Sequence, residues 1–349
     1  MENKQLLNQS SRIGITGATG MVGSYLLKTL LSKGYTNITC LKRPSSSLEL
    51  TGNPGSQVQW QDGDLLDTES LWEFADGLDV VFHCGAMVSF NPKRKKDLHR
   101  INVTGTADLV DACLAQGVGF FVHCSSVSAL GKAGKDGITD EEAEWDPKAH
   151  NSPYAKTKYY SEMEVFRAMA EGLEGAIINP SIILGGGFWK KGSARLHLTV
   201  SRGLPFYPMG SGGFVDARDV AEMMIDLCNP AYSGRRFICN AENRSYRDIL
   251  SRIATGLDVK APGKPLKKWM ISTAPLLFKA GRFLGLNTPK VTADMLKASH
   301  RNARYNNERS IEELGFKYRP IDQTLDSLSE AYLQSQKMGK DYGLLPVDA

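Results

Sequence analysis

A tyrosine and a lysine stand four residues apart in the segment SPYAKTK, at Tyr154 and Lys158. Ser152 is suited to cap a helix and Pro153 to its first turn, so the spacing predicts two side chains on one helix face. A phenol with a pKa of about 10 is a poor base at neutral pH, but a nearby ammonium stabilises phenolate and lowers that pKa. The pair is a candidate proton donor and acceptor, although the pattern alone is common and mostly structural.

A serine pair supports the chemical interpretation. Ser125 and Ser126, in HCSSVSALG, follow an apolar run that is typical of a strand. Ligands of open parallel sheets bind along the edge at which the strands end. A hydroxyl at that edge can donate a hydrogen bond to a substrate oxygen as negative charge develops on it. Alone, Ser126 would be a structural residue at a strand end; together with the tyrosine-lysine pair it becomes a catalytic candidate.

Glycines recur every third residue in the segment TGATGMVG, between the first apolar run and the helical run over residues 21–31. Missing side chains permit a tight turn, let the backbone approach a pyrophosphate and allow close packing of helix on strand. The anion would bind the free amides and the positive dipole end of the helix. The turn therefore predicts a dinucleotide site, with candidate contacts at Gly17, Thr19, Gly20, Met21, Val22 and Gly23.

A basic pair, Lys42 and Arg43, stands where the second strand is expected to end. Enzymes that bind NAD at such a turn usually place an acidic residue on the adenosine ribose about 20 positions further on. No Asp or Glu occurs between Ser24 and Leu48. A guanidinium suits a ribose 2′-phosphate by charge and fork geometry. The pair could also be a solvated loop end, but the sequence favours NADP, with NAD as the alternative.

Short apolar runs alternate with helical patterns in the first half of the chain, as in repeated strand and helix units of a parallel sheet. Stretches such as VVF and FFV fit strands that are covered on both faces. The predicted strands are residues 12–16, 37–41, 58–61, 79–84, 119–124 and 175–179. We therefore predict an α/β fold with a doubly wound parallel sheet, the Rossmann fold.

The pattern changes after Pro180 to loops rich in Gly, Pro and aromatic residues, followed by a helical segment near residues 219–227. We expect a polar tail over residues 1–11 and a dinucleotide-binding domain over 12–184, with returning segments over about 213–240. Residues 185–212 and 241–349 would form a smaller carboxyl-terminal substrate lobe.

Composition is that of an ordinary globular protein of 349 residues, with 42% hydrophobic and 23% charged residues. The net charge of +4 gives no indication of nucleic acid, and the basic run 93–96 is typical of a solvated face. Six singly placed cysteines predict free thiols, no metal site and a reducing compartment. Because residues 1–11 contain no apolar leader and no run is long enough to span a membrane, the expected location is the cytoplasm.

In this order the motifs resemble the extended short-chain dehydrogenase/reductase family, part of the NAD-dependent epimerase/dehydratase superfamily, over about residues 12–240. The pattern is most similar to the branch of dihydroflavonol reductases and 3β-hydroxysteroid dehydrogenases. Besides the motifs above, the resemblance rests on GDLLD, VFHCGA, NVTGT, NPSIILG and FVDARDVA, at residues 63–67, 81–86, 102–106, 179–185 and 214–221.

The resemblance implies a role for each matching residue. In such enzymes a serine, a tyrosine and a lysine polarise and protonate the carbonyl, and the lysine also holds the nicotinamide ribose; here these would be Ser126, Tyr154 and Lys158. Ser126 is preferred to Ser125 because Gly131 follows it at the family's spacing. The further cofactor-side residues would be Asp64 and Leu65 at the adenine, Gly85 and Ala86 along the cofactor, Asn102 in the active-site network, and Pro180 and Ile183 near the nicotinamide.

Three functions remain open at this point. The first is an NADP-dependent oxidoreductase that interconverts a carbonyl and a secondary alcohol, the second a nucleotide-sugar epimerase, and the third a non-catalytic NADP-binding protein. Related dehydratases carry Thr-Asp-Glu after the serine strand, where this chain has Val127, Ser128 and Ala129. Sugar enzymes usually place an arginine shortly before their FVDARDVA segment, where Gly212 and Gly213 stand here. The oxidoreductase is favoured.

An apolar substrate is expected, because aromatic and apolar side chains crowd the segment after the nicotinamide loop. They could instead build the core of the lobe; they are Phe188, Trp189, Leu204, Phe206, Tyr207, Met209 and Phe214. Residues 267–284 could close over the substrate or form a plain lobe helix. His83 and His150 are expected to be structural, because the tyrosine-lysine pair already supplies the proton. Residues 98–115 and 154–170 resemble the helices of the family's dimer contact, so we expect a homodimer.

Overall fold

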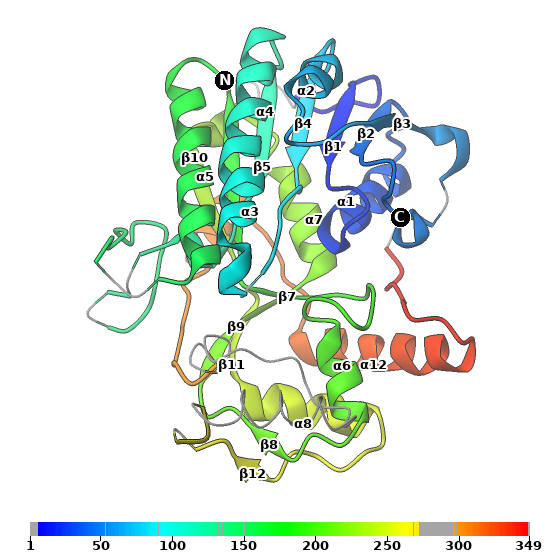
Figure 1. The fold of residues 1–349 in the computed structure, drawn as a ribbon, viewed down its shortest axis with the longest axis vertical. Coiled ribbons are helices and arrows are strands. Elements are labelled where there is room, and N and C mark those ends of the chain that lie inside the picture. Colours follow the sequence, from blue (N-terminus) through cyan, green and yellow to red (C-terminus); the bar gives the residue numbers. More distant parts are fainter. Residues whose placement is uncertain are drawn as a thin grey trace.

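The computed structural model describes residues 6–52, 54–89, 91–131, 133–134, 136–148, 151–267, 269–271, 296 and 299–347. Within these ranges the central sheet has seven parallel strands in the order β10-β6-β5-β4-β1-β2-β3 (Figure 1). The strands are β1 (Ile13–Thr16), β2 (Ile38–Lys42), β3 (Val58–Asp62), β4 (Val80–His83), β5 (Phe120–Cys124), β6 (Gly175–Pro180) and β10 (Arg235–Cys239). The predicted doubly wound parallel sheet is confirmed.

The strand order reverses between β1 and β4. From β1 the chain steps outward through β2 and β3, then returns to β4 on the other side of β1 and continues through β5 and β6. Ligands of open parallel sheets bind at such a switch point, at the carboxyl ends of the strands. The turn after β1 and the loop after β4 meet there, which brings the predicted glycine turn beside the VFHCGA segment.

Helices cover both faces of the sheet and bury two apolar clusters against it (Figure 1). Helices α1 (Met21–Ser32) and α7 (Ala217–Asp226) pack together on one face. On the other face α4 contacts both α2 and α5; these helices are α2 (Thr68–Ala75), α4 (Gly105–Ala115) and α5 (Pro153–Ala170). The chain is helical throughout 98–115, as expected, with a π-helical turn, Arg100–Thr104, between α3 (Lys95–His99) and α4.

A smaller lobe lies beyond the carboxyl edge of the sheet (Figure 1). Strand β9 pairs with β7 and β11, so of the returning segments only β10 enters the central sheet while α7 covers it. Strands β8 and β12 form a separate pair. The elements of this part are β7 (Ile182–Leu184), α6 (Arg195–Ser201), β8 (Phe206–Tyr207), β9 (Ser211–Asp216), β11 (Glu242–Ser245), α8 (Tyr246–Gly256), β12 (Lys264–Pro265) and α12 (Ile321–Lys337). Helix α11 (Glu308–Leu314) packs against β10 instead.

Two of the aromatic side chains that were candidates for a substrate pocket belong to the core instead. Trp189 is 1% exposed, stands edge-on to Tyr332 and donates its indole N–H to Ser335 Oγ at 2.7 Å. Phe214 is fully buried on β9. Met209, in contrast, is 60% exposed. The segment 267–284 falls largely outside the described residues.

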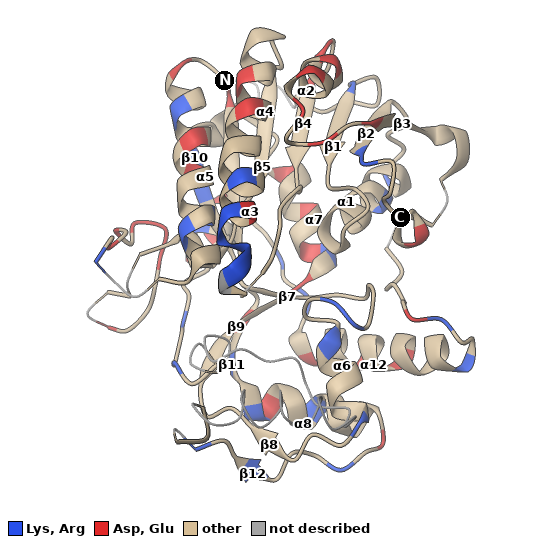
Figure 2. Cartoon of the chain, viewed as in Figure 1, with Lys and Arg blue, Asp and Glu red and all other residues tan. Residues whose placement is uncertain are grey.

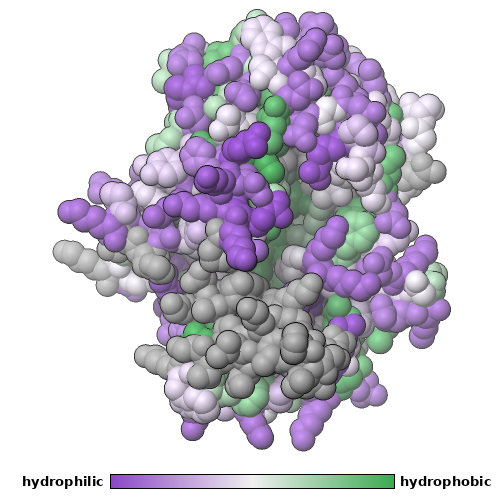
Figure 3. Space-filling model, in the orientation of Figure 1, coloured by the Kyte–Doolittle hydropathy of each residue, from purple (hydrophilic) through white to green (hydrophobic). Residues whose placement is uncertain are grey.

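The surface is hollowed between the sheet domain and the lobe, with hydrophobic side chains visible in its depth (Figure 3). Hydrophilic side chains lie on both sides of this opening (Figure 3). The basic run 93–96 lies in α3 and in the turn before it (Figure 2). Its residues are exposed. None of the described helices is long and apolar enough to cross a membrane.

Candidate active site and dinucleotide cradle

The turn after β1 has room for glycine only. Gly17 has a φ of +75°, and a Cβ atom there would lie 2.7 Å from the backbone C of Cys84 and the backbone N of Gly85. A Cβ atom at Gly23, in the first turns of α1, would lie 2.3 Å from the carbonyl oxygen of Gly17. The glycines therefore permit the close approach of strand, loop and helix that the sequence predicted.

The amino terminus of α1 fits the phosphate group of a dinucleotide. Its N-cap is Gly20, which has no side chain to bond the first amides, and the first turn contains no acidic residue. Such an end combines unsatisfied N–H donors with the positive end of the helix dipole. Thr19, Met21 and Val22, the remaining candidates of this turn, flank the cap directly. The residues of this chain can thus hold a pyrophosphate.

The basic pair at the end of β2 is divided by the structure. Lys42 lies opposite Asp62 of β3 and forms an ion pair with its carboxylate. Arg43 follows at the exposed end of the strand. Asp62 was missed from the sequence because it is brought opposite Lys42 only by the strand register. Arg43 is therefore the stronger candidate for a 2′-phosphate.

The loops predicted to line the cofactor come together at the carboxyl end of β1. Leu65 lies against both Gly85 and Gly105, at which added Cβ atoms would be 3.1 and 2.9 Å from its side chain. The backbone N–H of Gly85 donates to Thr16 Oγ1 at 3.3 Å. Asp64 accepts from the amide of Leu66 at 3.0 Å, which shapes the turn after β3. Next to Gly85, Ala86 is exposed.

The structure brings the three catalytic candidates together at the end of β5. Ser152 caps α5 by accepting from the amide of Ala155 at 3.1 Å, as the sequence predicts. Lys158 is 2% exposed, and its Nζ donates to the carbonyl oxygen of Cys124 at 2.8 Å. The hydroxyl of Tyr154 is hydrogen-bonded to the side chain of Ser126. The first turns of α5 thus face the end of β5.

The neighbours of Ser126 determine the direction in which its hydroxyl donates a hydrogen bond. Its Oγ accepts from the amide of Ser128 at 3.2 Å and from the hydroxyl of Ser128 at 3.0 Å. With both lone pairs engaged, the O–H of Ser126 points its hydrogen at another acceptor, such as a phenol or a substrate oxygen. Ser128 was not among the predicted site residues, and the extra serine in SSVS was the available signal.

Tyr154 keeps its proton at neutral pH. Burial raises the pKa of Tyr154, and the hydrogen bond from Ser126 opposes that rise only in part. Burial also lowers the pKa of Lys158. Lys158 directs its Nζ at the Cys124 carbonyl, and burial of the phenol dominates the pKa of Tyr154. The site therefore presents a neutral phenol, which is suited to donate a proton.

Asn102 joins the loop after β4 to helix α5. Its Oδ1 accepts from the amide of Met87 at 2.7 Å, and its Nδ2 donates to the Met87 carbonyl at 2.9 Å. The same Nδ2 donates to Thr157 Oγ1 at 3.1 Å. Thr157, one residue before Lys158, was missed from the sequence. These bonds fix the cofactor-side loop relative to Lys158.

His83 is a neutral structural residue in the described structure. Its ring nitrogens contact Thr16 Oγ1 at 2.6 Å and Thr106 Oγ1 at 3.0 Å. Burial lowers the pKa of His83 to about 3. His150 lies outside the described residues.

The two residues predicted near the nicotinamide lie at the carboxyl end of β6 and just beyond it. Pro180 is the last residue of β6, which pairs with β5, and Ile183 lies in β7.

The NAD dependent epimerase/dehydratase family model matches residues 13–237. A Synechocystis sp. protein assigned as a dihydroflavonol 4-reductase is 30% identical over 323 residues, covering 89% of this chain and 91% of that protein. Sterol demethylase protein B of Methylococcus capsulatus is 28% identical over 306 residues, covering 86% and 92% of the two chains. The crystal structure of gox2253 is similar with a TM-score of 0.79 at 27% identity, covering 95% of this chain and 99% of that one.

The cradle can be tested by adding one methyl group. In Gly23→Ala the new Cβ meets the backbone of Gly17, so the turn has to shift. We expect NADPH affinity, measured by fluorescence titration, to fall by about tenfold or more, equivalent to at least ~1.4 kcal/mol. Gly263→Ala is the control, because no atom lies within 4 Å of a Cβ there. Equal affinity in both variants would contradict the assignment of the cradle.

Proposed function

The chain belongs to the NAD dependent epimerase/dehydratase family, and we propose that it is an NADP-dependent reductase that interconverts a carbonyl and a secondary alcohol on an apolar small molecule. The names of its relatives, which include reductases and a sterol-processing protein, support this branch of the family. All six cysteines are free thiols, which supports a cytoplasmic location.

The grouping of Tyr154, Ser126 and the buried Lys158 at the end of β5 is the observation on which the proposal rests. When bound, the nicotinamide supplies the hydride. The Ser126 hydroxyl would hydrogen-bond the substrate oxygen, because its own lone pairs are engaged by Ser128. Tyr154 would give its proton to that oxygen as negative charge develops there. The resulting phenolate would lie one helical turn from the ammonium of Lys158, whose positive charge would stabilise it.

Close packing around Gly213 supports a carbonyl substrate over a nucleotide sugar. A Cβ atom at Gly213 would lie 2.2 Å from Asn240 Oδ1 and 2.8 Å from the ring of Tyr305. At Gly212 it would lie 3.3 Å from Ile182 and 3.4 Å from the hydroxyl of Tyr246. A diphosphate-binding arginine has no room at Gly213, and at Gly212 its Cβ would be in tight contact with two side chains.

Tyr154→Phe tests the proton donor. The ring is retained and the hydroxyl is lost, so turnover of a carbonyl substrate should fall by about 100-fold or more, the scale of lost general acid catalysis. NADPH affinity should change little. Tyr160→Phe, an exposed position on the same helix, is the matched control. Near-normal turnover of the Tyr154 variant would rule out the proposed donor.

Arg43→Ala tests cofactor choice. Charged hydrogen bonds to a 2′-phosphate are worth about 1.5–3 kcal/mol, or roughly 10- to 150-fold in affinity. The preference for NADPH over NADH should largely disappear in this variant. Lys42→Ala should have the smaller effect, because Lys42 is already paired with Asp62. Equal affinity of the unmodified protein for both cofactors would refute the NADP preference.

A homodimer through α4 and α5 is the last part of the proposal. Their outer face is charged (Figure 2), with Arg167 bridging Asp111 of α4 and Glu164 of α5, and it exposes 46% of Tyr160. Light scattering at micromolar concentration should give twice the chain mass of 38.3 kDa. Tyr160→Glu should shift the protein towards monomer. A monomer mass for the unmodified protein would exclude the dimer.

A further inference from the structure

Glu162 is a buried carboxylate one helical turn after Lys158. It lies on α5, and its side chain is fully inaccessible to solvent. A buried charge is strongly unfavourable unless it is paired and its oxygens are hydrogen-bonded. The groups that satisfy Glu162 connect it to two of the catalytic candidates.

Asn179 joins Glu162 to Ser126. This buried side chain of β6 donates from Nδ2 to Glu162 Oε1 at 2.5 Å and to the backbone carbonyl of Ser126 at 3.1 Å. A side-chain amide has two N–H donors, so both bonds form at once. The backbone of Ser126 is therefore fastened to the carboxylate of Glu162.

Arg236 of β10 meets the other oxygen of Glu162. Its Nη1 lies 3.3 Å from Glu162 Oε2, and its side chain is 19% exposed. Its Nε donates to the backbone carbonyl of Glu141 at 2.8 Å, which holds the guanidinium in place. The ion pair thus reaches from the interior of α5 to the edge strand of the sheet.

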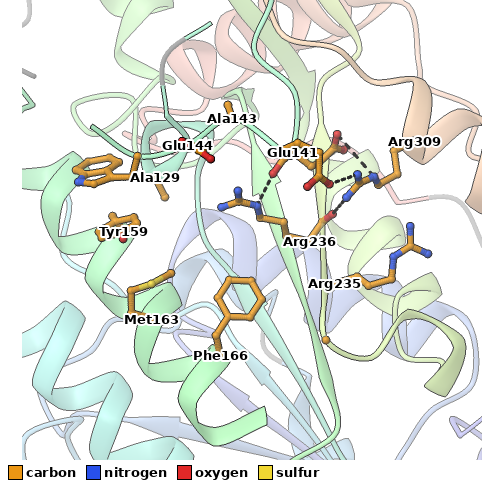
Figure 4. A pocket seen from close by; sticks show the side chains of 13 residues that line it. Ala129, Glu141, Ala143, Glu144, Tyr159, Met163, Phe166, Arg235, Arg236 and Arg309 are labelled. Atoms are coloured by element: carbon orange, nitrogen blue, oxygen red, sulfur yellow. Dashed lines mark hydrogen bonds and ion pairs between the residues drawn. The ribbon is translucent and has the colours of Figure 1, made fainter. Parts of the chain in front are cut away.

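The outer end of this connection lies in the wall of a pocket of about 530 Å³ beside β10 (Figure 4). There Arg236 lies beside Glu141, and Arg309 forms an ion pair with Glu142. Arg309 also donates to the backbone carbonyl of Arg236 at 3.2 Å. Because these guanidiniums are engaged by carboxylates and carbonyls, the wall braces the edge strand.

Lys158 and Glu162 carry opposite charges on successive turns of α5, and each changes the pKa of the other. Burial lowers the pKa of Lys158, whereas the neighbouring Cys124 and then the carboxylate of Glu162 raise it. Burial also raises the pKa of Glu162, whereas the charges of Arg236 and Lys158 lower it. Each charged form is therefore favoured by the presence of the other.

Other titratable groups face Lys158 from the neighbouring strands. They are His83 and Cys84 at the end of β4, and His123 and Cys124 on β5. Burial lowers the pKa of both histidines far below neutrality, so they are uncharged. The hydrogen bond to Cys124 raises the pKa of the Cys84 thiol. Among the described groups that change the pKa of Lys158, Glu162 is the carboxylate, and it lies four residues further along α5.

We propose that Glu162 is a positioning residue of the active site, which holds Ser126 through Asn179 and provides the counter-charge that keeps Lys158 protonated. Arg236 braces it from the edge strand. This inference rests on the proposed function, because Glu162 acts through the serine and lysine of the proposed reductase.

Two substitutions separate the two roles. Glu162→Gln keeps an acceptor for Asn179 but removes the charge, so the pKa of Lys158 should fall. As the pH is raised, Lys158 should then lose its proton, and the enzyme its activity, earlier than in the unmodified protein. The alkaline limb of kcat should move down by about one pH unit. Glu162→Asp keeps the charge but is one methylene too short for Asn179, so kcat should fall by about tenfold with the limb unmoved. NADPH affinity should change little in either variant.

Glu164→Gln is the matched control, because Glu164 lies on the same helix and pairs with Arg167 at the surface. It should leave both kcat and the alkaline limb unchanged. An unmoved limb in Glu162→Gln would overturn the counter-charge role. Normal kcat in Glu162→Asp would overturn the connection to Ser126, and this second variant keeps the inference testable if Glu162→Gln does not fold.

A titration without substrate separates this inference from the proposed function. Lysine labelled with ¹³C at Cε, with the Lys158 resonance assigned by Lys158→Met, reports the protonation of Lys158 in the full chain. The resonance should titrate at lower pH in Glu162→Gln than in the unmodified protein. Equal titration would contradict the inference, whereas failure of the unmodified protein to reduce any carbonyl would contradict only the proposed function.

Discussion

Burial of Lys158 at the carboxyl end of β5 is the constraint around which the active site is organised. Its ammonium, 2% exposed, needs the Cys124 carbonyl at 2.8 Å, because a charge leaves water only where hydrogen bonds and opposite charge replace it. Helix α5 therefore has to start beside β5, which places Tyr154 against Ser126. The same burial keeps the phenol of Tyr154 protonated.

The other half of the site depends on the absence of side chains. Gly17 and Gly23 let β1, α1 and the loop after β4 approach one another closely, so the amino terminus of α1 opens at the switch point of the sheet. That edge also carries the serine and tyrosine. The cradle and the proton donor thus meet because both are located at the ends of neighbouring parallel strands.

Local signals were enough to predict the sheet, the glycine turn and the Ser152 cap, because apolar runs, glycine spacing and cap residues act over a few positions. The pairing of Lys42 with Asp62 depends on strand register and could not be derived that way. Burial of Trp189 and Phe214 was equally hidden, since an aromatic side chain suits both a pocket and a core. Glu162 looked like an ordinary helix residue until Asn179 and Arg236 were placed beside it.

Transfer of a labelled hydride tests the central claim most directly. The protein would be incubated with NADPH carrying deuterium at C4 of the nicotinamide, together with apolar ketones and nucleotide sugars, and the products analysed by mass spectrometry. The account predicts deuterium on the carbinol carbon of an apolar alcohol. Epimerised sugar as the only product, with apolar ketones unchanged, would contradict it.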